Sequence, residues 1–71
     1  MTYETLRCRT SVLIARADAC ADGFDRIGKT FSAGLTRDMA KACRSMPDTA
    51  PLYEHWIGEQ ETRLAGMEAR P

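Results

Sequence analysis

The chain has 71 residues, ten basic and ten acidic, and a hydrophobic fraction of 44%. This length fits one domain, and folding buries only ~60% of the surface of so short a chain, which leaves a thin margin of stability. Three cysteines without a C-x-x-C pair and one histidine supply too few closely spaced ligands for a structural zinc site. We therefore expect no metal, no cofactor and self-association as the additional source of stability.

The beginning of the chain predicts neither a secretion signal nor a membrane span. The longest early apolar run, residues 12–15, is much shorter than either segment would need, and Glu4, Arg7 and Arg9 precede it. We therefore expect a cytoplasmic protein without a membrane partner, in which the thiols stay reduced.

An apolar stripe with a spacing of three and four predicts a long first helix over about residues 3–32. The stripe consists of Tyr3, Leu6, Thr10, Leu13, Ala17, Cys20, Phe24, Ile27 and Phe31. Its four heptads exclude a strand. We expect Ser32-Ala33-Gly34 to interrupt the helical pattern, and a break near Gly23 is the alternative because glycine weakens a helix interior.

The same helix has a second apolar face opposite the stripe. At ~100° per residue, Cys8, Val12, Ala15 and Ala19 fall together on that side. Polar residues separate the two faces: Glu4, Arg7, Ser11 and Asp18 follow one flank, and Arg9 and Arg16 follow the other. A helix with two apolar faces is packed on both of them. We predict a homodimer whose interface contains Cys8, Val12, Ala15 and Ala19.

Two shorter helices are predicted over about residues 35–46 and 51–68, separated by a turn that contains Pro47 and Pro51. Apolar positions on the first of these are Leu35, Met39, Ala42, Cys43 and Met46. The last helix aligns Tyr53, Trp56, Ile57, Gln60, Leu64 and Met67. The predicted fold is all-α: a single domain with a long N-terminal helix, arranged as a small antiparallel helical hairpin or three-helix bundle.

The charges divide into a basic middle and an acidic tail. Residues 26–47 have five basic side chains and one acidic, a balance of +4, whereas residues 48–71 have two basic and five acidic, a balance of −3. These segments could complement one another within the fold or across a dimer. The alternative is a nucleic-acid-binding transcriptional or RNA regulator. Its phosphate contacts would be Arg26, Lys29, Arg37, Lys41 and Arg44.

Such a regulator would use a helix–turn–helix, with residues 24–31 as the first helix, a turn at 32–34 and a second helix from Leu35. The sequence has no asparagine and one glutamine, so side chains that read adenine are scarce. Catalysis is also poorly supported, because His55 and Glu59 form only an i,i+4 surface pair and no glycine-rich phosphate loop follows a strand. We expect that the protein is not an enzyme.

The predicted function is that of a small helical protein–protein interaction module. Eight arginines against two lysines suggest a G+C-rich bacterial or phage genome, and short chains of this kind are typical of phage- or plasmid-type accessory proteins that bind and inhibit or regulate a larger host protein. Bulky amphipathic and arginine side chains at the edges of the predicted core are the candidate contacts. They are Tyr3, Arg7, Arg16, Leu52, Trp56 and Arg63.

Overall fold

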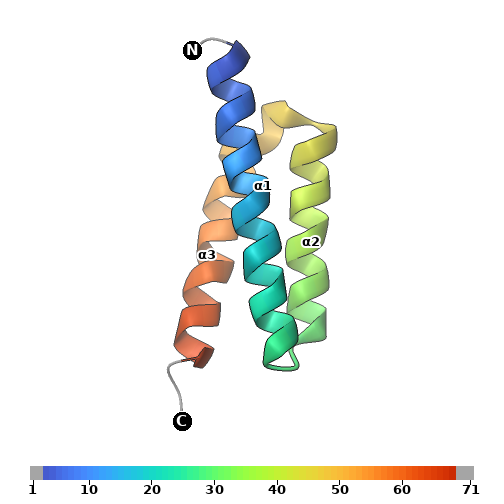
Figure 1. The fold of residues 1–71 in the computed structure, drawn as a ribbon, viewed down its shortest axis with the longest axis vertical. Helices are drawn as coiled ribbons and strands as arrows, with labels where there is room; N and C mark the ends of the chain where they lie inside the picture. Colours follow the sequence, from blue (N-terminus) through green and yellow to red (C-terminus); the bar gives the residue numbers. More distant parts are fainter. Residues whose placement is uncertain (1–2, 69–71) are drawn as a thin grey trace.

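The computed structural model describes residues 3–68, with side chains from Arg9 onward. Within that range the chain forms three α-helices, α1 (Tyr3–Arg26), α2 (Thr30–Ser45) and α3 (Ala50–Glu68), and a short 3-10 helix, η1 (Pro47–Thr49), before α3. Figure 1 shows the helices side by side, with α1 antiparallel to α2 and α2 antiparallel to α3. The all-α prediction is confirmed, and no helix in the described range is long and apolar enough to span a membrane.

The first helix ends at Arg26, six residues earlier than the predicted boundary. Gly28 has a φ of 80°, in the left-handed region that glycine adopts without strain. The Gly28 N–H donates to the Asp25 carbonyl at 3.0 Å, and the Lys29 N–H donates to the Phe24 carbonyl at 2.8 Å. These two hydrogen bonds are the pair that closes a helix in a Schellman motif. The chain therefore reverses at Gly28.

The predicted break at residues 32–34 is wrong, because those residues lie inside α2, where Ser32 and Ala33 are buried. The second helix begins at Thr30 instead of near residue 35. It ends where Met46 takes an extended conformation (φ −134°, ψ 79°), as residues before proline do. Pro47 then opens η1, and α3 begins at Ala50 with Pro51 in its first turn, where a missing N–H costs no hydrogen bond.

The core consists of two clusters along α1. The first contains Leu13, Ala17, Ala40, Cys43, Ala50 and Ile57, with the partly buried Ile14, Met39 and Tyr53 against it. The second contains Cys20, Ala21, Phe24 and Ala33, with Leu64 and Met67 against it. Many of these side chains are small, which lets the helix backbones approach closely. At Gly23 an added Cβ atom would overlap Cδ2 of Leu64.

The predicted apolar stripe is buried from Thr10 to Phe24 and ends there. Ile27 and Phe31, predicted as its last core positions, are exposed. The reason is the reversal at Gly28: Ile27 lies in the turn, and Phe31 belongs to the first turn of α2. A periodicity that assumes one continuous helix cannot hold across a change of direction.

Candidate functional site

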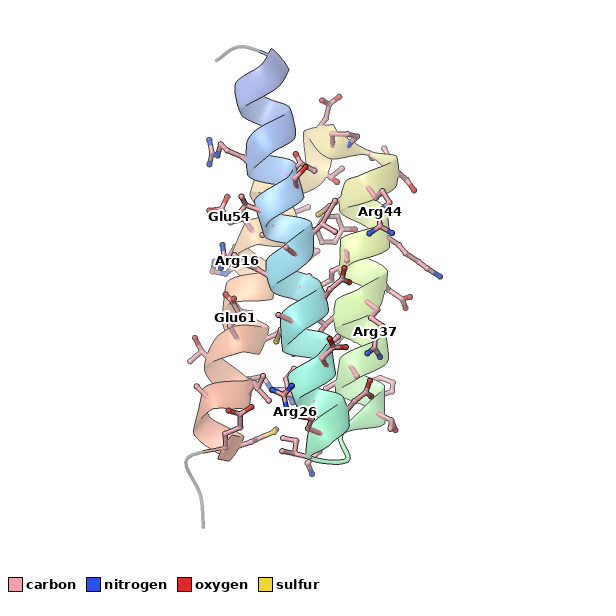
Figure 2. All side chains as sticks on the ribbon, in the orientation of Figure 1. Arg16, Arg26, Arg37, Arg44, Glu54 and Glu61 are labelled. Carbon is pink, nitrogen blue, oxygen red and sulfur yellow. The ribbon has the colours of Figure 1, made fainter. Side chains whose placement is uncertain are left out.

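Ion pairs join α1 to α3 along one flank. The guanidinium group of Arg16 makes two hydrogen bonds to the Glu61 carboxylate, one of them from Nε to Oε2 at 3.2 Å. About two turns nearer the start of α3, Arg9 Nη2 lies 3.5 Å from Glu54 Oε2. Figure 2 shows Arg16 between the two labelled glutamates. The hydrogen bond to Glu61 raises the pKa of the Arg16 guanidinium.

The opposite flank of α1 is acidic and pairs with α2. Arg37 donates to Asp25 Oδ2 at 2.6 Å and to Asp22 Oδ1 at 3.0 Å, and the Arg44 guanidinium lies 4.0 Å from the Asp18 carboxylate. The hydrogen bonds to Asp25 and then Asp22 raise the pKa of Arg37. The basic middle of the chain is thus matched by α1 and not by the acidic tail: no ion pair joins α2 to α3 among the described side chains.

These pairings change the view of the basic residues predicted for phosphate binding. Arg37 and Arg44 have carboxylate partners, whereas Arg26, Lys29 and Lys41 are exposed. The predicted helix–turn–helix is also wrong, because the turn is at Gly28 instead of 32–34, and α1 and α2 run antiparallel side by side (Figure 1). A recognition helix must project away from its preceding helix to enter a major groove. In this fold α2 is packed along α1.

The outer face of α1, predicted as the dimer interface, is open to solvent. Val12 is 56% exposed, and Ala15 and Ala19 are exposed beside it. The Cys8 side chain lies outside the described side chains. Among those described, this face offers one large apolar group and two methyl groups.

A larger apolar surface lies along α2 and α3, on the side away from α1. At ~100° per residue, Phe31 and Leu35 lie on the flank of α2 opposite the one that carries Arg37 and Arg44. Leu52 and Trp56 lie on the flank of α3 opposite Glu54 and Glu61. Since those ion pairs mark the sides that face α1, the apolar flanks border the seam between α2 and α3. We call this surface the α2–α3 face; its large exposed side chains are Phe31, Leu35, Met46, Leu52 and Trp56.

The exposure of these side chains is unusual for a chain with so little core. Phe31 is 84% exposed, Met46 62% and Leu52 54%. Of the seven large hydrophobic side chains exposed in the described part of the chain, five belong to this face; Val12 and Ile27 are the others. Several large apolar side chains exposed on one face of a small protein mark a site of interaction more often than an ordinary surface.

The structure brings some of the predicted contact residues together and separates others. Leu52, Trp56 and Arg63 share the α2–α3 face, where Trp56 meets Tyr53 edge to face at a centroid distance of 5.4 Å and Arg63 donates to Gln60 Oε1 at 3.0 Å. Arg16 is instead held by Glu61. Tyr3 and Arg7 lie outside the described side chains.

Sequence reasoning missed Phe31 and Leu35 as surface residues because both were assigned to core stripes. The signal that could have found them is Gly28, because glycine is the residue that most often ends a helix in the left-handed conformation.

The side-chain pair considered for catalysis lies on the surface of α3. His55 Nε2 lies 3.1 Å from Glu59 Oε1 on the exposed side of α3, where both side chains are hydrated. No group of three or more His, Cys, Asp or Glu side chains within the described range could hold a metal ion. Cys20 and Cys43 are free thiols, and burial raises the pKa of each, which disfavours the nucleophilic thiolate.

Comparison of the chain with family models, with curated proteins and with solved structures gives no match. The function is therefore inferred from the surfaces alone.

Proposed function

We propose that the protein is a helical protein–protein interaction module, a homodimeric three-helix bundle that binds and inhibits or regulates a larger host protein. The observation that carries this proposal is the α2–α3 face, on which five large apolar side chains remain in solvent. Burial of an exposed phenylalanine side chain against a partner surface would contribute ~1.5–3 kcal/mol to the free energy of binding. A chain this small gains stability by covering such a surface.

The proposal needs one surface for the second copy and another for the host protein. The two candidates are the α2–α3 face and the outer face of α1 with Cys8, Val12, Ala15 and Ala19. They lie on opposite sides of the molecule, because α1 packs between them. One protomer can therefore contact both partners at once without steric conflict.

The kind of partner follows from the surface chemistry. The charged flanks of α1 form ion pairs within the fold. On the α2–α3 face the large exposed side chains are apolar or aromatic, the composition of the centre of a protein interface. A cytoplasmic accessory protein of the phage or plasmid type would meet a bacterial host protein in this way.

An affinity capture from nuclease-treated extract of the native host tests this function. We expect one host protein to be retained after nuclease treatment and to bind purified chain with an affinity that changes little between low and moderate salt. Phosphate binding would lose ~10³-fold or more over the same salt range for six or more contacts. Material that disappears with nuclease, combined with loss of activity in Arg26→Glu with Lys41→Glu, would instead identify a nucleic-acid-binding regulator.

A further inference from the structure

The charged residues beside the α2–α3 face differ from those on the flanks of α1. Asp38 borders the shallow depression formed by Thr30, Phe31 and Leu35, and Lys41 follows one helical turn later. Neither side chain has a hydrogen bond or ion pair with any other side chain in the described range. Asp38 and Lys41 thus place unpaired charges of opposite sign at the rim, and Arg63 on the face itself donates to Gln60 Oε1 without a carboxylate partner among the described residues. A rim of one sign would suit an oppositely charged partner, whereas a rim of both signs suits a copy of itself.

The exposed apolar area of the face also matches one half of a stable dimer interface. With ~200 Å² for each large side chain, the exposures of the five residues amount to about 550 Å². A standard interface buries ~800 Å² on each partner, of which ~56–65% is apolar, or roughly 450–520 Å². The outer face of α1 offers only Val12 as a large described group and falls far short of this area.

We infer that a second copy of this chain covers the α2–α3 face, with the two α2 helices antiparallel about a two-fold axis. The inference rests on the proposed function, in which one exposed face takes a second copy. It assigns the α2–α3 face to self-association and leaves the outer face of α1 for the host protein, the reverse of the assignment predicted from sequence.

The residue order along α2 fits this symmetry. Phe31 and Met46, the two most exposed apolar residues of the face, lie at opposite ends of α2, ~22 Å apart at 1.5 Å per residue. If Phe31 of one copy meets Met46 of the other, the axis passes between positions 38 and 39. Asp38 then lies within ~3 Å, along the helix direction, of Lys41 in the partner copy. The two-fold axis would then form two equivalent ion pairs, each between Asp38 of one copy and Lys41 of the other.

The third helix places an aromatic group at the same level. Ile57 packs in one cluster with Ala40, near the middle of α2, so the neighbouring Trp56 lies close to the proposed axis. The two copies of Trp56 would face each other there, with Leu52 beside them. Trp56 is the single tryptophan of the chain, and its fluorescence therefore reports on the interface directly.

Sedimentation equilibrium of the full chain at concentrations from below one to tens of micromolar tests the inference. We expect a dimer, with Trp56 emission moving to longer wavelength on dilution. Phe31→Ser should raise the dimer Kd about 30-fold or more, as loss of a hot spot does. Its control is Val12→Ser, which removes an apolar group that is 56% exposed on the outer face of α1 and should leave the Kd unchanged.

A charge exchange tests the two-fold register. Asp38→Lys and Lys41→Asp should each weaken the dimer about 5-fold, because each opposes like charges in the partner copy, and the double variant should return the Kd to within about 2-fold of the original. Both substitutions are at exposed positions, and circular dichroism of the three variants should show that the helices persist.

Three results would overturn the inference. A monomeric wild type at tens of micromolar would remove the second copy, while the host-protein part of the proposed function would still stand or fall on the capture experiment. A dimer broken by Val12→Ser and not by Phe31→Ser would assign self-association to α1. A double charge variant as weak as the single ones would exclude the antiparallel register.

Discussion

Substitution of Gly23 by alanine has two opposing effects on the free energy of unfolding, one from helix propensity and one from the packing of α1 against α3. In a helix interior, glycine to alanine alone stabilises by ~1 kcal/mol. At Gly23 the new Cβ would overlap Cδ2 of Leu64, which packs against the cluster around Phe24. Leu64 must leave its position, and overpacking of this kind costs ~1–3 kcal/mol. We therefore expect Gly23→Ala to lower the free energy of unfolding by about 1 kcal/mol.

Gly58→Ala in α3 is the matched control, because a Cβ there has no atom within 4 Å. It should raise the free energy of unfolding by ~1 kcal/mol, so the two variants should differ by about 2 kcal/mol. For a domain of this size each kcal/mol moves Tm by ~4–8 °C, which thermal melts resolve. All melts need one protein concentration, since dimerisation makes Tm depend on concentration.

A double-mutant cycle identifies the atom responsible. In a Leu64→Ala background the overlapping methyl group is gone, and Gly23→Ala should then stabilise by ~1 kcal/mol relative to Leu64→Ala alone. If Gly23→Ala stabilises the wild-type chain as much as Gly58→Ala does, α1 and α3 do not approach each other at Gly23 and the reasoning is refuted.

Two further predictions concern the turn and the buried thiols. Gly28→Ala should destabilise by ~1–2 kcal/mol because its φ is left-handed, whereas Gly34→Ala, inside α2 with open space around it, should not; equal effects in urea titrations would contradict the position of the turn. Burial raises the pKa of Cys20 and Cys43 above the ordinary 9.0, so the thiols of the unfolded chain lose their protons at lower pH than those of the folded chain. The stability that the protonated thiols contribute should therefore be complete below about pH 9 and decline as pH rises through their folded pKa. Urea midpoints at about pH 8 and about pH 10 check this decline, and a Cys20→Ala, Cys43→Ala variant that declines as steeply would exclude the thiols as its cause.

Much of the fold follows from local sequence signals. The proline pair 47 and 51 marks the boundary between α2 and α3 because proline cannot donate within a helix. The stripe from Leu13 to Phe24 identifies the buried side of α1 because one side chain in three or four must face the core. The polar flanks were also visible, since Asp18 and Arg16 follow opposite sides of the helix; which neighbour each flank meets depends on the packing of three helices.

The position of the first turn could not be read from the same signals. Gly28 and Gly34 are both glycines within an amphipathic pattern, and each could end a helix or lie inside one. Whether the helix ends at Gly28 or at Gly34 depends on which of Ala33 and Phe31 is buried against α1. The structure buries Ala33 and leaves Phe31 in solvent. That outcome reflects the space available beside α1, where small residues permit a close approach that a phenylalanine would prevent. The α2–α3 face could not be predicted without the position of this turn, because Phe31 and Leu35 reach the surface only when the chain reverses at Gly28.

The unlike charges on the two flanks of α1 have a consequence for the handedness of the fold. Three antiparallel helices joined by short turns can be wound in two mirror-related topologies, and apolar packing alone discriminates poorly between them. Exchange of α2 and α3 around α1, with the buried side of each helix kept toward the core, would turn the flanks that carry Arg37 and Glu61 away from α1. Each native ion pair is exposed and weak by itself. The mirror topology would lose all of them, so the charge pattern of α1 favours the observed hand of the bundle.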